Sequence, residues 1–233
     1  MRRSARELGV RAEARLARVP EGAHALLRRC RVRGAAMRVN LSWEGGLVSR
    51  PESVVRVTML VREYHPPEAG EYARGVKLVV WPWPRAMGNP VHRHKSLSYA
   101  ENMAARRMAS KAHAFDALFT NLRGHVAEGT ATNIFLVERG RLVTPPLGEG
   151  LLPGVTRKHL LAIAARTGIE VRERAFGVDR LCAADEAFVA NSLAEVVPVS
   201  RVEGRRAGGP GPVTRALAEA YRAELRAAIE EAR

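Results

Sequence analysis

The sequence predicts an α+β (mixed α/β) fold in two domains. Short β-branched stretches alternate with Ala-rich helical stretches, no segment repeats, and a Pro-rich break at 64–70 interrupts the pattern. With 233 residues, 46% of them hydrophobic, the chain is long enough to bury a substantial core. We expect a partial small α+β domain at 1–65, a linker at 66–74 and a larger domain at 75–233.

The N-terminal domain is expected to contain two helices followed by two strands. Residues 2–17 are rich in Arg, Ala and Glu, and a second helical stretch at 21–31 follows Pro20. The stretch 36–43 alternates in the manner of a strand, and 54–61 is short and β-branched. These elements form a small unit that ends at the Pro-rich break.

The larger domain is expected to mix strands and helices along its whole length. Its last helix begins with Pro212 in the first turn, and Gly168 is a suitable C-cap for the helix before it. Ser98 is a possible N-cap for the first helix. The expected helices are 98–113, 156–167 and 212–231. The expected strands are 75–81, 115–120, 133–138, 141–144, 170–175, 186–190 and 196–202, with Arg139-Gly140 joining two of them as a hairpin.

Composition limits the classes of function. A formal charge of +14 would suggest nucleic acid, but 34 of the basic residues are arginines spread along an Ala-rich chain, and only four are lysines. This pattern favours compositional drift, and nucleic-acid binding stays as an alternative. The apolar runs are far below the roughly 20 residues that span a bilayer, and the stretch after Met1 does not resemble a secretory signal. We therefore expect a cytoplasmic protein in which Cys30 and Cys182 are unpaired.

Lys95 is a candidate nucleophile. It lies in the run from His94 to Tyr99, between a Pro-rich loop and an expected helix. A nucleophilic lysine needs burial or neighbouring positive charge, so that part of its amine is unprotonated near neutral pH. His92, Arg93 and His94 could supply such charge if they converge on it. On this segment alone, a surface lysine in a basic loop is the simpler interpretation.

Glu128 follows Lys95 by 33 residues and directly precedes Gly129, which allows a close backbone approach. A carboxylate placed against a pyridine nitrogen keeps that nitrogen protonated, so that the ring can accept electrons. A lysine and such a carboxylate are the two groups that a pyridoxal phosphate enzyme most needs. An exposed glutamate at a strand end is the alternative interpretation.

Two further segments suggest anion binding. Gly154, Val155 and Thr156 lie at the start of an expected helix, where the free N–H groups of the first turn and the helix dipole favour an anion. Asn191 and Ser192 follow an expected strand and could add polar groups. The alternatives are an ordinary Thr N-cap in the first segment and an ordinary turn in the second.

No metal site is expected. The histidines His24, His113 and His159 lie in expected helices without metal-ligand spacing to a partner, and His92 and His94 on a loop do not predict zinc. The sequence also has no Gly-x-Gly-x-x-Gly motif, nucleophile elbow or Walker A loop.

Taken together and in this order, these segments resemble the class IV (fold type IV) pyridoxal-phosphate-dependent aminotransferases. That family includes branched-chain aminotransferases, D-amino-acid aminotransferases and aminodeoxychorismate lyases. The resemblance runs from about Gly75 to Thr214, with Ser98 where the family usually has asparagine. The matching segments are Lys95-Ser96-Leu97-Ser98-Tyr99, Ala127-Glu128-Gly129 with Asn133-Ile134-Phe135, Leu152-Pro153-Gly154-Val155-Thr156-Arg157, Asn191-Ser192-Leu193-Ala194-Glu195 and Gly211-Pro212-Val213-Thr214.

The resemblance implies a two-domain fold type IV enzyme with pyridoxal 5'-phosphate as its cofactor. It implies that Lys95 is the catalytic residue and forms a Schiff base, that Glu128 faces the pyridine nitrogen, and that Tyr99 lies near the ring oxygen. It places the remaining cofactor-binding residues around the phosphate: Gly154, Val155, Thr156, Asn191 and Ser192.

The function that the resemblance implies is transfer of an amino group between an amino acid and a 2-oxo acid, by a homodimer. The first alternative is a 4-amino-4-deoxychorismate lyase, which eliminates pyruvate with the same lysine and cofactor. The spacing Lys-Ser-Leu-x-Tyr is shared by the lyase and D-amino-acid branches, whereas Ala194-Glu195 favours aminotransferases. A catalytically inactive, truncated homologue is a further alternative.

The N-terminus departs from the family pattern. Family members begin with several strands and a Glu-His-x-x-Arg-Leu motif whose arginine holds the phosphate. This sequence begins just after that point, at Met1-Arg2-Arg3, so we expect an incomplete small N-terminal domain. A start codon assigned too late is favoured over a genuine truncation. The missing strands would also shape the dimer interface and the substrate pocket, so the substrate is left open.

Overall fold

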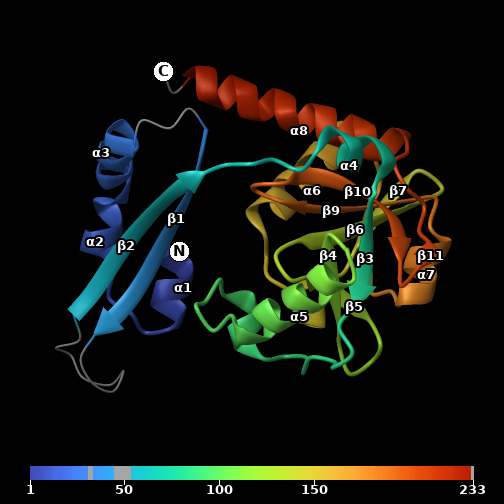
Figure 1. Ribbon diagram of the computed structural model, residues 1–233, viewed down its shortest axis with the longest axis horizontal. Helices are drawn as coiled ribbons and strands as arrows, with labels where there is room; N and C mark the ends of the chain where they lie inside the picture. The colour runs from blue at the N-terminus through green and yellow to red at the C-terminus, as the bar shows by residue number, and fades with distance from the viewer. Residues whose placement is uncertain (31–33, 45–53, 232–233) are drawn as a thin grey trace. The chain divides into compact units, whose positions relative to one another are not determined.

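The computed structural model describes residues 1–30, 34–44 and 54–231 (Figure 1). The chain forms two compact units, Met1–Pro66 and Pro67–Arg233. Each unit contains both helices and strands, which confirms the predicted α+β class. Within the described residues, no helix combines the length and apolar character needed to cross a membrane.

The described residues of the first unit form three helices and one antiparallel strand pair. The helices are α1 (Arg2–Glu7), α2 (Glu13–Ala17) and α3 (Val19–Cys30), and the strands are β1 (Ala35–Glu44) and β2 (Val54–Glu63). The strands agree with the predictions at 36–43 and 54–61, and α3 agrees with 21–31 up to residue 30; residue 31 lies outside the described residues. The small core of this unit consists of Ala5, Val10, Ala12 and Leu16.

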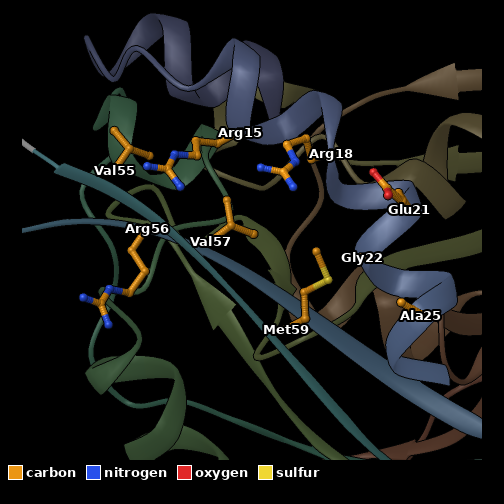
Figure 2. A pocket seen from close by; sticks show the side chains of 9 residues that line it. All are labelled: Arg15, Arg18, Glu21, Gly22, Ala25, Val55, Arg56, Val57 and Met59. Atoms are coloured by element: carbon orange, nitrogen blue, oxygen red, sulfur yellow. The ribbon is translucent and has the colours of Figure 1, made fainter. Parts of the chain in front are cut away.

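Burial alternates along β2, so that one face of the strand lies against the helices of this unit. Val55, Val57 and Met59 are half-buried, whereas Arg56 is exposed, and Figure 2 shows Val57 and Met59 on the opposite side of the strand from Arg56. A Cβ at Gly22 of α3 would lie 3.0 Å from the Met59 Cε. The glycine therefore lets α3 lie close against β2.

The single helix predicted for residues 2–17 is wrong. Gly9 has φ +71°, a left-handed conformation that ends a helix, and the Val10 N–H donates to the Ala5 carbonyl at 2.8 Å. The chain therefore turns between α1 and α2. The turn buries Val10 and Ala12, a tertiary gain that overrides the helical propensity of the segment.

The second unit is built on a nine-stranded sheet of order β5-β4-β3-β10-β9-β6-β7-β8, with β11 paired to β10. Strand β3 is parallel to β4 and β10, and β7 is parallel to β8; the other neighbours are antiparallel. The strands are β3 (Val76–Val80), β4 (Asp116–Thr120), β5 (Val126–Gly129), β6 (Asn133–Glu138), β7 (Arg141–Thr144), β8 (Val171–Glu173), β9 (Glu186–Asn191), β10 (Glu195–Val202) and β11 (Arg205–Arg206).

Helices cover this sheet in Figure 1, and α6 packs beside α8. The elements are α4 (Ala69–Arg74), α5 (Ala100–Lys111), α6 (Val155–Arg166), α7 (Val178–Ala183), α8 (Pro212–Glu231) and the short 3-10 helices η1 (Pro90–Arg93) and η2 (Leu147–Glu149). Phe135 and Phe188 stack at 4.7 Å in the core that includes α6 and α8, while Ile134 and Leu136 of β6 belong to the core on the other face. Burial on both faces explains why these strands are continuous apolar runs.

The predicted hairpin of β6 and β7 is confirmed, as are the predicted strands that correspond to β3, β4, β9 and β10 and the helices that correspond to α6 and α8. Helix α5 begins later than predicted, after Tyr99, and Ser98 is not its N-cap. Strand β8 is shorter than predicted, and β5, α7 and β11 were not predicted. The segment 66–74, predicted to be a linker, contains α4, because Glu68 and Glu71 form a capping box that starts a helix there.

Candidate active site

The second unit contains all of the site residues predicted from the sequence. Lys95 follows η1 in the loop before α5, and Tyr99 is the N-cap residue of that helix. Glu128 lies in β5, and Gly154 is the N-cap of α6, two residues before Thr156. The remaining pair, Asn191 and Ser192, lies at the end of β9 and in the turn that follows.

Glu128 is a buried carboxylate with partners on both oxygens. Its Oε2 accepts from the Leu152 N–H at 3.0 Å, and its Oε1 lies 3.4 Å from Arg85 Nη1. Burial raises the pKa of the Glu128 carboxyl to about 7. The Leu152 N–H, Arg85 and Lys95 lower that pKa in this order, and Asp116 raises it. The exposed Lys95 is therefore close enough for its charge to act on Glu128.

Arg85 lies in the loop after β3, and its buried side chain contacts the start of α5. Its guanidinium lies over the Phe119 ring, with Cζ 3.2 Å from the ring centroid. Its Nε lies 2.7 Å from Glu101 Oε2 and its Nη2 donates to Asn102 Oδ1 at 2.9 Å. Together with the contact to Glu128, each of its three nitrogens has a different partner. This planar fork fixes the geometry around the carboxylate.

Tyr99 and Asn102 converge on one backbone oxygen. The Tyr99 hydroxyl donates to the Thr130 carbonyl at 2.6 Å, and Asn102 Nδ2 donates to the same oxygen at 2.7 Å. Burial, then the charges of Glu128 and Asp116, raise the pKa of the Tyr99 phenol. The phenol is therefore held in its neutral form, close to the loop that follows Glu128.

The loop after Glu128 is fixed by Asp116. The Asp116 carboxylate accepts from the Thr130 N–H at 3.1 Å and from the Thr132 hydroxyl at 2.9 Å, and also from the Thr130 hydroxyl. A Cβ at Gly129 would lie less than 3.0 Å from both Thr132 Oγ1 and Asp116 Oδ2. The absence of a side chain at Gly129 therefore lets the backbone lie close to these two side chains.

The N-terminus of α6 has the features of an anion site. Gly154 is an N-cap without a side-chain cap, and the first turn has no acidic residue. The buried Thr156 Oγ1 lies 3.5 Å from the exposed Ser192 hydroxyl and 3.3 Å from the Tyr221 hydroxyl of α8. Backbone N–H groups, two hydroxyls and the positive end of a helix of 12 residues match a phosphate group.

The N-terminus of α8 is different because a carboxylate fills it. Glu186 accepts from the Val213 N–H at 3.0 Å and from the Thr214 N–H at 2.7 Å. A Cβ at Gly211 would lie less than 3.0 Å from the Glu186 side chain. The segment Gly211–Thr214 is therefore a cap for α8, and its N–H groups are engaged within the protein.

Asn191 supports its own turn. Its Oδ1 accepts from the Leu193 and Ala194 N–H groups at 2.8 and 2.7 Å, and its Nδ2 donates to the Ala131 carbonyl at 3.1 Å. These bonds tie the turn that carries Ser192 to the loop after Glu128. All of these bonds of the Asn191 side chain go to backbone groups. Asn191 therefore supports the predicted cofactor site by holding the surrounding backbone in place.

The described residues form two hollows that are not lined by the predicted site residues. One, of about 530 Å³, lies in the first unit between α2, α3 and β2 and includes Arg15, Arg18 and Arg56 (Figure 2). The other, of about 370 Å³, lies beside β7 and β8 in the second unit and is rich in arginine. Within the described residues, no three His, Cys, Asp or Glu side chains gather in a way that could hold a metal ion, and both cysteines are free.

Comparison with protein families shows which family the chain belongs to. The family model for class IV amino-transferases matches residues 1–202. The chain belongs to the class IV aminotransferase family.

Individual family members agree with this assignment. A Methanocaldococcus jannaschii protein provisionally named branched-chain-amino-acid aminotransferase is 36% identical over 160 residues, which cover 67% of this chain and 55% of that protein. The Thermobaculum terrenum branched-chain aminotransferase in its PLP form has 27% identity and a TM-score of 0.75, covering 87% of this chain and 68% of that one.

A Legionella pneumophila protein assigned provisionally as a 4-amino-4-deoxychorismate lyase has 28% identity and a TM-score of 0.84, covering 94% of this chain and 81% of that one. The chain spans about half the length of the curated relatives it matches. These structural neighbours share the fold type that the sequence predicted.

Several residues around this class IV site were not found from the sequence. Arg85 lies in a Pro-rich loop that has no periodic pattern, so no local signal marked it. Asn102 and Asp116 have ordinary positions in a helix and a strand. Tyr221 shares the buried face of α8 with Leu217, and this position gives no signal that it is a neighbour of Thr156.

Proposed function

We propose that this protein is a pyridoxal-phosphate-dependent aminotransferase that moves an amino group between an amino acid and a 2-oxo acid, with the second unit as its cofactor-binding domain. The observation that carries the proposal is the arrangement of a lysine, a buried carboxylate and an uncapped helix N-terminus in one unit. Lys95 acts electrostatically on Glu128, and the loop after Glu128 is bonded to the turn that carries Ser192.

The residues present fit this cofactor. A dianionic phosphate matches the N-terminus of α6, where Thr156 and Ser192 add hydroxyls and no acidic side chain competes. A protonated pyridine nitrogen matches the Glu128 carboxylate, which Leu152 and Arg85 hold in place. When bound, pyridoxal phosphate supplies an electron sink for the bond broken at the substrate Cα.

The chain's own residues then have distinct roles. Lys95 would supply the amine that holds the cofactor, and its free amine would move the proton at the substrate Cα as general base and acid. Glu128 keeps a proton on the pyridine nitrogen. Tyr99 would orient the ring through its hydroxyl, Val155 would contribute a backbone N–H to the phosphate, and Gly154 would allow the first turn of α6 to approach it.

Covalent labelling tests the central role. Recombinant protein incubated with pyridoxal phosphate should show a visible absorption band that borohydride abolishes, and peptide mass spectrometry should locate the reduced cofactor on Lys95. Lys95→Ala should lose the label, whereas Lys111→Ala, in the exposed last turn of α5, should keep it. A protein that remains colourless and takes up no added cofactor would overturn the proposal.

A second function, pyruvate elimination by a 4-amino-4-deoxychorismate lyase, is favoured by one observation. The Legionella structure provisionally assigned to that activity matches 94% of this chain with a TM-score of 0.84. An amino-donor screen with 2-oxo acid acceptors, run beside a pyruvate-release assay on aminodeoxychorismate, separates the two. Pyruvate release without amino transfer would replace the first proposal by the second.

We also propose that the active form is a cytoplasmic homodimer, as the resemblance to class IV enzymes implies. Light scattering of the purified protein tests the assembly. A monomer at micromolar concentration, both with and without cofactor, would contradict this part of the proposal without affecting the covalent label on Lys95.

A further inference from the structure

Arg85 has a fixed position at the end of β4. Its N–H donates to the Thr120 carbonyl at 2.8 Å, and its own carbonyl accepts from the Leu122 N–H at 3.3 Å. Its side chain is 5% exposed and lies against Phe119. An arginine anchored at both backbone and ring loses little further conformational freedom when it binds its partners.

The first arm of Arg85 reaches Glu128. Burial disfavours the ionised carboxylate, and Arg85 opposes this effect from 3.4 Å. The other charged or titratable groups that act on Glu128 are Lys95, which also favours ionisation, and Asp116, which opposes it. Tyr99 faces the same carboxylate, whose charge raises the pKa of the phenol.

The second arm of Arg85 reaches Tyr99 through Asn102. Arg85 Nη2 donates to Asn102 Oδ1, so the amide nitrogen of Asn102 must face the other way, toward the Thr130 carbonyl. Tyr99 donates to that same carbonyl. The guanidinium therefore decides which way the amide points, and the amide shares with the phenol the oxygen that holds it.

We propose that Arg85 is a positioning residue that supports two cofactor contacts at once, the carboxylate of Glu128 directly and the phenol of Tyr99 through Asn102 and the Thr130 carbonyl. The inference rests on the proposed function for the meaning of these contacts. The pairing itself is a property of the chain. One guanidinium links the group at the ring nitrogen to the group at the ring oxygen, so a change at Arg85 alters both.

The direct arm is tested on the full chain without added cofactor. Urea unfolding between pH 5 and 9 is compared for wild type, Arg85→Gln, Glu128→Gln and the double variant. The ionisation of Glu128, expected near pH 7 in wild type, should move upward by about one pH unit in Arg85→Gln. In the Glu128→Gln background, Arg85→Gln should cause no such shift, and this background also subtracts effects of Arg85 on the nearby His92.

The indirect arm is tested by cofactor affinity. Asn102→Ala should raise the dissociation constant of pyridoxal phosphate about tenfold, and Tyr99→Phe should add little in that background. Arg85→Lys keeps the charge and loses the fork, so it should leave the ionisation of Glu128 near wild type and bind cofactor as Asn102→Ala does. Arg123→Gln, which removes an exposed charge from the neighbouring turn, should behave as wild type.

Each outcome decides one part. A purely structural Arg85 would lower the free energy of unfolding equally at every pH. An unchanged Glu128 ionisation in Arg85→Gln overturns the direct arm. Independent effects of Asn102→Ala and Tyr99→Phe overturn the indirect arm. If Arg85→Gln does not fold, Arg85→Met, which also removes the charge, replaces it in the direct test, while Arg85→Lys and Asn102→Ala carry the indirect test. If wild type and every variant fail to take up cofactor, the proposed function is overturned, and so is the role of Arg85 in cofactor binding. A shift of the Glu128 ionisation in the apo protein would still support the pairing of Arg85 with Glu128.

Discussion

Replacing Gly154 by alanine should disturb the N-terminus of α6 through side-chain overlap alone. Gly154 has φ −63° and ψ 143°, a conformation that alanine adopts without strain. Its Cβ, however, would lie less than 3.0 Å from Asn133 Oδ1 and 3.2 Å from Asn133 Cγ. Asn133 is 5% exposed and its Nδ2 donates to the Leu152 carbonyl at 3.0 Å, so it has no free direction in which to move.

The magnitude follows from these contacts. Overpacking of a filled site costs about 1–3 kcal/mol, and losing the bond between Asn133 and Leu152 costs about 1 kcal/mol more. We therefore expect Gly154→Ala to lower the free energy of unfolding by about 2–4 kcal/mol. The displaced first turn should also weaken pyridoxal phosphate binding by roughly tenfold for each 1.4 kcal/mol of lost contact.

Urea unfolding and cofactor titration measure the two effects. Gly148→Ala is the matched control, because no atom lies within 4 Å of its added Cβ and its backbone is not left-handed. The double variant Asn133→Ala/Gly154→Ala should recover part of the cofactor affinity, because the overlapping atoms are gone. If Gly154→Ala unfolds and binds cofactor as Gly148→Ala does, the reasoning about the start of α6 is refuted.

Three other changes should have distinct effects. Glu128→Gln should remove a pH dependence from the apo protein. The folded-state pKa of about 7 lies above the ordinary value of 4.5, so the unfolded chain releases its proton first and the free energy of unfolding falls as pH rises across that window, by up to roughly 3 kcal/mol. Equal slopes for variant and wild type in urea unfolding would contradict this. Glu186→Ala should lower the free energy of unfolding by about 1–3 kcal/mol, because two N–H groups of α8 lose their acceptor. As a control, Glu219→Ala at an exposed position of the same helix should have no measurable effect. Similar urea midpoints for the two variants would show that the cap is dispensable. Thr156→Val should weaken cofactor binding about tenfold with little loss of stability, because it replaces a hydroxyl by a methyl of similar size; unchanged affinity in a fluorescence titration would exclude the hydroxyl from the phosphate site.

Local signals in the sequence were sufficient to predict much of the fold and to select the residues of the candidate site. Strands such as β6 and β9 were found because their apolar runs and flanking turns are short-range features. Lys95, Glu128 and Thr156 were found because each lies in a motif of consecutive residues. The family assignment followed from the order of these motifs, and the family model confirmed it.

Features that depend on distant partners were not predictable in this way. The helix expected at 2–17 is broken because Val10 is buried in a core formed with other elements. The order of the strands in the sheet places β10 between β3 and β9. This order depends on how the long connections bring strands that are distant in the sequence side by side. A single sequence has no local pattern that records either choice.

The sequence by itself determined the chemistry available to this protein: a lysine, a carboxylate and a helix start suited to a phosphate, in the order typical of class IV aminotransferases. Only the tertiary structure decided how those groups are held. Arg85 lies 43 positions before Glu128 in the sequence and yet lies against it, while Tyr221 of α8 lies beside Thr156. Such contacts arise from packing between elements, because burial forces each polar group to find whichever partner the fold brings near it.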